Sequence, residues 1–566
     1  MIGPIYRFIK DSFKELSPWH NIKLFHTNVK GDILAGITVA IIALPMALAF
    51  GEMSQLGPVA GLWGAIAGGI IGGFFGGCVV GMSGPTAPKA AQIATFMSVI
   101  VGGSEDPYVA AFSIIFLSGL IMIFISMLKI SKFIHYIPYS VVAGFMCGIG
   151  MIVILTQINA FVGLPNEKSI HAVFKNLGAT IQNINIEALF VAVPSLLILF
   201  LWRPIVSKYN FLKSVPSPLI ALIVGTGIAS FMELKIPLIG EAMNQSTSSD
   251  IFSFYFPDFT QLAAFLGPAF ALAGLAILDS LLSCKVADNM TGSRHSSDRE
   301  TFGQGMANMA AGLFGGVTTA TATMRTVANI KFGGKTPLSS IIHGLTLLGI
   351  LLGLGFLVEN IPNACLAAIL FKVGIDILDY RILAVLRKIP ITDFCVFVVV
   401  LFVTVYSDLM IAVGIGFLLA FLSYFKDFVT ILRSGHKHKI IPFQESELIS
   451  MESVPKKLNS STISFLRLEG SFFFGSTEPV ISAYKNSQKH KFLIIDITNI
   501  SSIDLSGIYA LEDLVLNAQK NNITVFVFNT NPDIKSTIEK VGFIKNIGKE
   551  NYKEEKDFIS SLGTIS

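Results

Sequence analysis

Charged side chains are scarce in this chain. Of its 566 residues, 14% are charged and 52% are hydrophobic, whereas about 25% of the residues of an ordinary soluble domain are charged. The formal net charge is only +4, which is too small to indicate nucleic acid as a partner. A chain so poor in charge is predicted to be a polytopic α-helical membrane protein that lies in lipid.

Signatures of metal binding, disulfide bonding and enzymatic chemistry are also absent from the sequence. The five cysteines lie in or beside apolar runs and form no CxxC pair, so we predict free thiols and no zinc site. His436 and His438 form an HxH in a basic segment, which is typical of a solvated stretch. There is no Walker-type glycine loop and no nucleophile triad. We therefore predict that the protein is not an enzyme and holds no organic cofactor.

Apolar runs, by contrast, are abundant. A spanning helix needs about 20 apolar residues, and runs near this length recur from residue 33 to residue 425. We predict fourteen segments, at residues 33–50, 58–77, 87–101, 108–128, 135–158, 187–203, 214–234, 260–284, 301–315, 322–332, 337–358, 362–375, 390–408 and 409–425.

The positive residues indicate how these segments are oriented. Lysine and arginine gather at alternate ends of the segments, and positive charge is retained on the cytoplasmic side of membranes. This pattern predicts that both termini are cytoplasmic. Residues 1–30 lack the apolar core of a cleavable signal peptide, so we predict a cytoplasmic N-terminal segment there, followed by a transport domain at residues 31–425.

Two polar breaks interrupt the apolar pattern in matching positions. Residues 76–89 and 315–329 are rich in glycine, threonine and proline, and each break follows two apolar segments and precedes a short one. With seven segments in each half, the second half enters the membrane from the opposite side. Inverted repeats with interrupted helices in matching positions point to a binding site at the breaks.

The chemistry of the two breaks suits a small anion. A helix that begins at membrane depth presents free N–H groups and the positive end of its dipole, which together bind anions. Thr86 opens the first half-helix, with Pro88 in its first turn. Thr321 and Thr323 are predicted caps of the second. That helix carries Arg325, and an arginine in the bilayer costs about 2.5–3.5 kcal/mol on insertion scales, so it is predicted to face an anionic ligand or a partner.

The composition becomes that of a soluble protein after residue 425. Residues 426–461 form a basic, polar stretch that we interpret as a linker. Within residues 462–566, strand-like runs at 463–468, 492–496 and 524–528 alternate with helical patterns at 507–520 and 533–541. This order predicts a small α/β domain with parallel strands.

Four motifs in order resemble one known family. They are GDILAGITVAIIALPMALAF at residues 31–50, GPT at 84–86, GGKT at 333–336 and IDLSG at 503–507. Together they resemble the SulP family of sulfate permease-like inorganic anion transporters, which carry a C-terminal STAS domain. The likeness covers nearly the whole chain. Within the family the chain looks most like the cyanobacterial sodium-dependent bicarbonate transporters.

The resemblance implies both a fold and a function. The implied fold has fourteen segments in two inverted repeats of seven, arranged as core and gate domains, plus a cytoplasmic STAS domain. The implied protein is a homodimer of the plasma membrane. Its implied activity is secondary active transport of a small inorganic anion, sulfate or bicarbonate. Proton-coupled dicarboxylate transport and an anion channel are the alternatives within the family.

The resemblance also assigns residues to the site. The implied substrate-binding residues at the two breaks are Thr86, Ala87, Ala322 and Thr323. In the bicarbonate transporters an acidic residue and a hydroxyl one turn later help to bind sodium. Here these positions hold Asp279 and Ser283, which are four residues apart and therefore share one helix face. The resemblance thus implies a sodium site at these two positions and no other metal, with transport that needs no sodium as the alternative because of Arg325.

Each of the two breaks carries one cationic residue, Lys89 in the first and Arg325 in the second. Arg325 stands where the bicarbonate transporters carry glycine, so it can supply the charge that sodium otherwise provides, bind the substrate, or pair with Asp279. Lys89 directly follows Pro88 in the first half-helix. Its ammonium group either reaches the site, where a second cation would favour a dianion such as sulfate, or turns to the cytoplasm and snorkels.

The STAS motif offers one regulatory candidate. In soluble STAS relatives the serine before the glycine of this loop is phosphorylated, and here that serine is Ser506. The alternative is that the loop only caps a helix.

Overall fold

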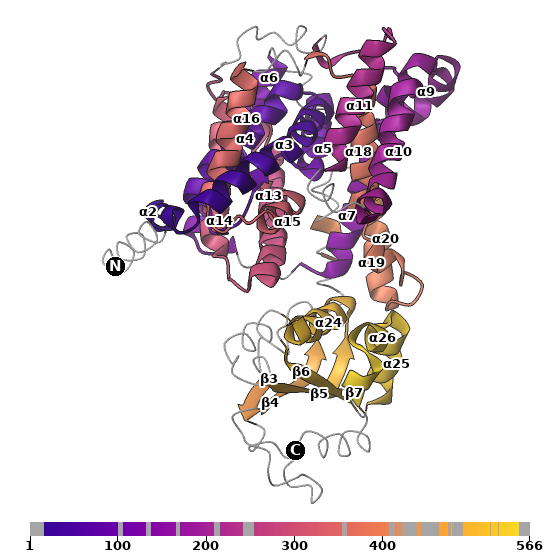
Figure 1. The fold of residues 1–566 in the computed structure, drawn as a ribbon. Coiled ribbons are helices and arrows are strands. Elements are labelled where there is room, and N and C mark those ends of the chain that lie inside the picture. The colour runs from indigo at the N-terminus through magenta and orange to yellow at the C-terminus, as the bar shows by residue number, and fades with distance from the viewer. Residues whose placement is uncertain are drawn as a thin grey trace, which may run out of the picture. The chain divides into compact units, whose positions relative to one another are not determined.

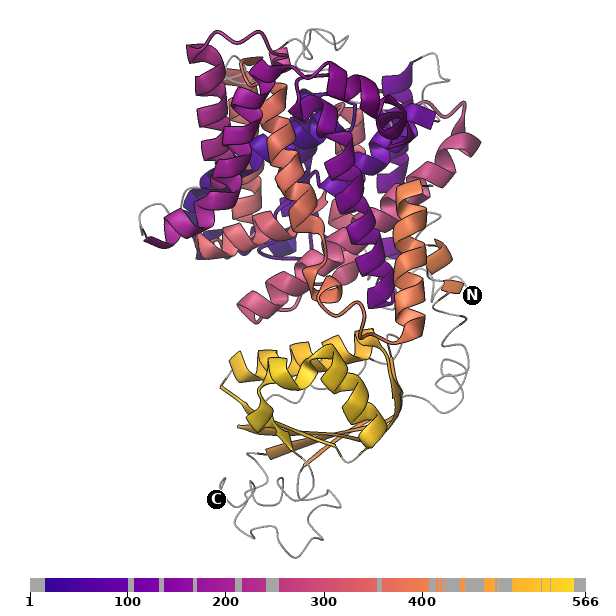
Figure 2. The same ribbon diagram turned by 90° about the vertical axis from the view of Figure 1, so that its right-hand side faces the viewer.

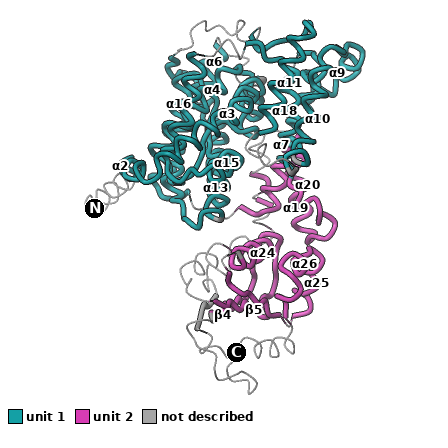
Figure 3. The backbone as a smooth tube through the Cα atoms, viewed as in Figure 1, with its two compact units in different colours: residues 1–134, 149–378 teal, residues 135–148, 379–566 magenta. Residues whose placement is uncertain are grey.

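The computed structural model describes residues 16–553 apart from several gaps. The residues left out within that range are 100–105, 132–136, 166–169, 209–215, 241–253, 354–358, 407–413, 417, 420–421, 423–437, 443–462, 474–476, 478–490, 521 and 530. The chain divides into two compact units, coloured separately in Figure 3. Unit 1 contains residues 1–134 and 149–378, and unit 2 contains residues 135–148 and 379–566.

Unit 1 is built almost entirely of helices (Figure 1). The long ones are α3 (Val29–Met53), α4 (Pro58–Phe75), α5 (Ala87–Val99), α6 (Pro107–Met127), α10 (Ile186–Lys208), α11 (Ser217–Phe231), α13 (Leu262–Thr291), α14 (Ser297–Leu313), α15 (Thr323–Lys331), α16 (Leu338–Gly353) and α18 (Asn363–Ile377). The shorter ones include α2 (Trp19–Ile22), α8 (Ile158–Phe161) and α9 (Ile170–Gln182). α7 (Tyr139–Thr156) begins in unit 2 and ends in unit 1.

These helices make the chain a polytopic membrane protein. Among the described residues, α3, α4, α6, α7 and α13 are each long and apolar enough to cross a membrane. α9 and α10 pass the same test together, although they meet at a bend of 114°. Every predicted segment up to residue 408 overlaps one of the described helices. The last, at 409–425, lies largely outside the described residues, and α9 was missed because its amphipathic pattern contains no long apolar run.

Glycine lets two of the helices around the site pack backbone against backbone. A Cβ atom on Gly61 of α4 would lie 1.9 Å from the carbonyl oxygen of Ala47 on α3. Only glycine fits such an approach, and small residues are the usual means of close packing between membrane helices. α16 lies against both helices, while α10, α11 and α18 pack against one another (Figures 1 and 2).

The same sequence of elements occurs twice in unit 1. α3 and α4 are followed by the two-residue strand β1 (Ser83–Gly84) and then α5, whereas α13 and α14 are followed by β2 (Ala320–Thr321) and then α15. Each strand and the short helix after it fall on one of the predicted breaks. The predicted repetition of a long helix, a second helix, a break and a half-helix is therefore present in the fold.

Unit 2 contains the predicted α/β domain. Its sheet has the order β3 (His438–Pro442), β4 (Ile463–Phe472), β5 (Phe492–Ile503), β6 (Thr524–Phe528) and β7 (Tyr552–Lys553). The helices of the domain are α24 (Leu505–Lys520), α25 (Pro532–Val541) and α26 (Phe543–Ile547). β4 to β7 are parallel as predicted, but β3 pairs antiparallel with β4. Part of the expected linker is therefore a strand, and the prediction that this stretch only connects the domains was wrong there.

Candidate anion-binding site

The two predicted breaks meet in space. β1 and β2 form an antiparallel pair in which Ser83 faces Thr321 and Gly84 faces Ala320. A further backbone bond of 2.9 Å runs from the N–H of Ala322 to the carbonyl of Met82. All six of these residues are buried. Because the two breaks satisfy each other's backbone groups, irregular chain can lie at membrane depth without lipid exposure.

Each break ends in a helix N-terminus. Thr86 accepts the first intrahelical bond of α5, from the N–H of Ala90, so the helix begins at the predicted residue. Ala322 is the N-cap of α15, and no side chain caps that helix. The prediction that Thr321 and Thr323 act as caps was therefore wrong. Their hydroxyls bond to the neighbouring helices instead, because these helices place a carboxylate and another hydroxyl within reach.

α13 contacts both breaks through one face. The hydroxyl of Thr86 donates to Asp279 Oδ2 over 2.7 Å. One turn further along the helix, Ser283 Oγ lies 2.8 Å from Thr323 Oγ1. Between them, Ser280 accepts a bond from the N–H of Thr321. The structure thus brings Thr86 and Thr323, which were predicted to bind substrate, into contact with the predicted sodium residues of α13. Asp279 bonds to the first half-helix, and Ser283 contacts the second.

The residues at the two breaks differ in their exposure. Thr323 is exposed and Asp279 is half-buried. Thr86 keeps 9% of its surface and Ala322 keeps 8%, while Ala87 keeps 2%. The starts of the two half-helices are therefore buried except at Thr323.

Arg325 lies in the interior and joins the two breaks. Its side chain is 2% exposed, and its Nη2 donates to the carbonyl oxygen of Pro85 in the first break. Its Nη1 has no hydrogen-bond partner among the described residues. The Asp279 carboxylate is close enough for a Coulomb interaction, but the two side chains form no direct ion pair. The structural ion pair considered from the sequence is thus absent.

Lys89 is completely buried. Its relative exposure is 0%, and Nζ has no partner among the described residues. The ammonium group therefore does not snorkel to water here. It lies within Coulomb range of both Asp279 and Arg325, which places it beside the meeting point of the breaks.

A polar face on α14 holds both breaks in place. Glu300 accepts from the N–H groups of Gly77 and Cys78 at 2.9 Å and from the hydroxyl of Thr321. Gln304 donates to Ser83 of β1 and Thr321 of β2, and Asn308 receives the N–H of Thr319. These three buried residues were not predicted. Their spacing of four residues along a short apolar segment was the available signal.

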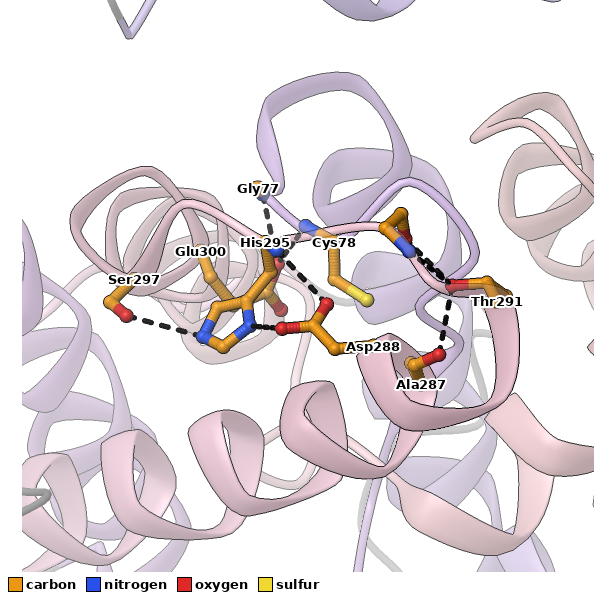
Figure 4. Close-up of polar contacts among 9 residues, drawn as sticks. Gly77, Cys78, Ala287, Asp288, Thr291, His295, Ser297 and Glu300 are labelled. Carbon is orange, nitrogen blue, oxygen red and sulfur yellow. Dashed lines mark hydrogen bonds and ion pairs between the residues drawn. The ribbon is translucent and has the colours of Figure 1, made fainter. Parts of the chain in front are cut away.

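The turn between α13 and α14 is also held by side chains (Figure 4). Asp288 accepts from the N–H of His295 over 3.0 Å, and the ring atom His295 Nδ1 lies 2.8 Å from Asp288 Oδ2. The other ring nitrogen lies 3.1 Å from Ser297 Oγ. These contacts fix the end of the helix that carries Asp279 to the start of the helix that carries Glu300.

No cluster in the described part of the chain suits a multi-residue metal site, since it contains no group of three or more histidine, cysteine, aspartate or glutamate side chains placed to hold an ion. Asp279 Oδ2 already accepts a bond from Thr86 of the first break, and Ser283 Oγ lies at hydrogen-bond distance from Thr323 of the second.

Comparison with known proteins decides the family. The sequence model of the sulfate permease family matches residues 29–400, which include both breaks. The chain belongs to the sulfate permease family. The STAS domain model matches residues 455–557, so the α/β domain of this sulfate permease family member is a STAS domain.

Similar proteins cover almost the full chain. The bicarbonate transporter BicA of Synechocystis is 32% identical over 558 residues, with 96% of each chain covered. The putative sulfate transporter YvdB of Bacillus subtilis is 29% identical over 544 residues, which is 94% of this chain and 97% of that protein. Both relatives are named as transporters, and this family member is accordingly a transporter of anions and not an enzyme.

Solved structures show the same architecture. The transmembrane domain of a cyanobacterial BicA matches with a TM-score of 0.62 and 34% identity, covering 68% of this chain and 97% of that chain. The murine Solute Carrier 26 family member A9 matches with a TM-score of 0.64 and 18% identity, covering 98% of this chain and 95% of that chain. At that identity the second likeness shows the fold alone.

Ser506 lies at a contact within unit 2. It is in the first turn of α24, and its Oγ accepts the N–H of Tyr139, the first residue of α7, over 2.9 Å. In return, Asp393 of α20 (Ile391–Tyr406) accepts the N–H of Leu505 over 3.0 Å. The STAS helix and two apolar helices thus exchange capping bonds.

A charged contact lies beside this one. Arg381 of α19 (Tyr380–Leu383) donates to Glu512 and Asp513 over 3.0 Å and covers the ring of Tyr509. Burial works to lower the pKa of Arg381, but the two carboxylates outweigh it, and this pKa lies above its usual value.

Proposed function

We propose that this protein is a secondary active transporter of a small inorganic anion, sulfate or bicarbonate, and that it works by alternating access. The observation that carries the proposal is the meeting of two half-helix N-termini at the paired strands β1 and β2. The names of the two similar transporters, one for bicarbonate and one for sulfate, support the choice of anion.

In this proposal the anion lies between the starts of α5 and α15. Free N–H groups at the two helix starts donate to the anion, and both helix dipoles present their positive ends to it. Thr86 and Thr323 stand at the two starts, with the backbones of Ala87 and Ala322. The unpartnered Nη1 of Arg325 supplies a fixed positive charge. α13 and α14 position these groups through Asp279 and Glu300.

We further propose that the protein is a homodimer of the plasma membrane with both termini in the cytoplasm. The distribution of lysine and arginine supports this orientation. A cysteine that replaces exposed Glu539 of the STAS domain, in a cysteine-free background, tests it. An impermeant maleimide should label that cysteine in inside-out vesicles and leave it unlabelled in right-side-out vesicles.

The transport proposal is tested with purified protein in liposomes. Uptake of labelled sulfate and of labelled bicarbonate should saturate, and an imposed ion gradient should drive accumulation. Competition with chloride and fumarate in the same preparation ranks the anions. Strong competition by fumarate together with proton-driven uptake would favour a dicarboxylate transporter. Large currents that never saturate would replace the transporter by an anion channel.

A regulatory role for Ser506 belongs to the same proposal. We propose that the capping contact between Ser506 and Tyr139 transmits the state of the STAS domain to α7. A phosphate group on Ser506 would add about −1.5 to −2 charges at a hydroxyl that now serves as an acceptor. The capping contact would then be lost.

A further inference from the structure

Lys89 is buried, and its ammonium group has no hydrogen-bond partner among the described residues. Its side chain is 0% exposed, and it ranks among the largest fully buried side chains of the described chain. An ammonium group has three donors, and here none of them has an acceptor. Burying a charge without a partner costs several kcal/mol. In a transporter, a bound anionic substrate can supply the missing acceptor.

The charges around Lys89 can be taken element by element. α5 packs against α3, α6 and α13. α13 contributes Asp279, and α15 contributes Arg325. α3 carries Glu52 close to its C-terminal end and α6 carries Tyr108 in its first turn, but neither interacts electrostatically with Lys89. Lys89 is therefore surrounded by one carboxylate and one guanidinium.

We propose that Lys89 and Arg325 together form a two-cation site that selects a divalent oxyanion, with sulfate as the best probe, over a monovalent one and that needs no sodium. This inference rests on the proposed function and deepens it. The geometry behind it is that, among the described residues, each cation keeps a nitrogen without a hydrogen-bond partner near the meeting point of the two half-helices. The one carboxylate of these residues that interacts with both cations, Asp279, bonds to Thr86.

Charge explains both parts of the proposal. The Coulomb energy between the anion and each fixed cation is proportional to the charge of the anion, so a second cation benefits a dianion twice as much as a monoanion. Without the two cations, Asp279 would leave the site with a negative charge, and a mobile cation such as sodium would have to balance it. With them, the fixed charge of the three side chains is already positive.

The test compares Lys89→Met, Lys89→Gln and Lys89→Arg with the unmodified protein in liposomes. kcat/KM is measured for sulfate and for bicarbonate, with sodium or choline as the only external cation. Lys372→Met is the matched control, because Lys372 is also a lysine of a membrane helix but pairs with Asp376 on its own helix.

The unmodified protein should prefer sulfate and give equal rates in sodium and choline. Met and Gln at position 89 should lower the sulfate-to-bicarbonate ratio by at least about tenfold, since a difference of 1.4 kcal/mol between the two anions suffices. Arginine should retain most of the ratio, and Lys372→Met should leave it unchanged. Sulfate should also raise the unfolding temperature of the unmodified protein more than that of the Met and Gln variants.

Two results would overturn the inference without touching the proposed function. One is saturable uptake that requires sodium in the unmodified protein. The other is an unchanged sulfate-to-bicarbonate ratio in the Met and Gln variants. If the unmodified protein moves no anion at all, the proposed function itself fails. The sodium comparison needs no variant, so the inference can be tested even if a substitution at Lys89 prevents folding.

Discussion

Gly84 and Arg325 approach so closely that a Cβ atom on Gly84 would lie 1.7 Å from Nη1 of the arginine. The same guanidinium donates through Nη2 to the carbonyl of Pro85. The Arg325 side chain of the second half-helix therefore packs directly against the backbone of the first break. This close contact is possible because residue 84 has no side chain.

Gly84→Ala is therefore expected to displace the guanidinium while the fold persists. The new methyl group meets the flexible end of the Arg325 side chain, which can move, while the φ of +159° at this position adds some backbone strain to the first break. Anion uptake should fall at least about tenfold, because a misplacement of about 1 Å in a preorganised site costs far more than the loss of a surface contact. Uptake into liposomes and the unfolding temperature in detergent are the measurements.

Gly274→Ala provides the control for that prediction. Gly274 also lies in a helix of unit 1, α13, but a Cβ atom there meets nothing within 4 Å. Alanine in an open helical position is neutral or slightly stabilising, so uptake should be unchanged. Equal activity in the Gly84 and Gly274 variants would show that the position of the guanidinium has no bearing on transport.

Arg325→Ala should abolish uptake and leave the protein folded. The substitution removes a fixed cation from an anion site and leaves one buried carbonyl, that of Pro85, without its donor. The loss of that partner costs about 1–3 kcal/mol, which lowers the unfolding temperature but does not unfold the protein. Arg325→Lys keeps the charge without the planar fork and should recover part of the activity. Full uptake by the alanine variant would refute the role proposed for this residue.

Glu300→Ala is expected to be the most destabilising change at the site. The carboxylate holds two backbone N–H groups of the first break and the hydroxyl of Thr321 in the second. Each buried donor left unsatisfied costs about 1–3 kcal/mol. The unfolding temperature should drop by several degrees, and uptake should fall with it. Glu539→Ala, at an exposed position of the STAS domain, should change neither, and a similar stability for both variants would contradict the role of Glu300.

Arg381→Glu should release the STAS helix from its contact with α19. The new carboxylate would face Glu512 and Asp513, which now hold the arginine at 3.0 Å. Hydrogen exchange of the amides in the first turns of α24 should accelerate, and uptake should change. The double variant Arg381→Glu with Glu512→Arg restores an opposite pair and should slow the exchange again. An exchange rate that is the same in all three proteins would exclude this contact as a coupling element.

The sequence predicted the organisation of the site well, because that organisation has local signals. Glycine, proline and threonine interrupt an apolar pattern at both breaks, and these interruptions are visible without any tertiary contact. Lys89 and Arg325 could be singled out because a charge in an apolar segment is costly wherever it lies.

Partners across the fold could not be predicted in the same way. Thr86 and Asp279 are 193 positions apart, and neither segment contains a local pattern that predicts contact with the other. Thr321 and Thr323 were assigned to local caps because helix starts favour hydroxyl residues there. In the structure, the hydroxyl of Thr321 bonds to Glu300 and that of Thr323 contacts Ser283, so neither hydroxyl caps the backbone N–H groups of α15. The strand β3 was missed because a basic, polar stretch gives no alternating apolar signal.

The contacts of α14 divide the site into two parts with different freedom to change. Glu300, Gln304 and Asn308 bond to the backbones and hydroxyls of the two breaks, whereas Thr323 and Met324 are exposed. Substitutions at the exposed residues can alter which anion is bound without disturbing the pairing of β1 with β2. The substrate preference can therefore evolve through single substitutions at these exposed residues, while the contacts of α14 keep the two helix starts in place.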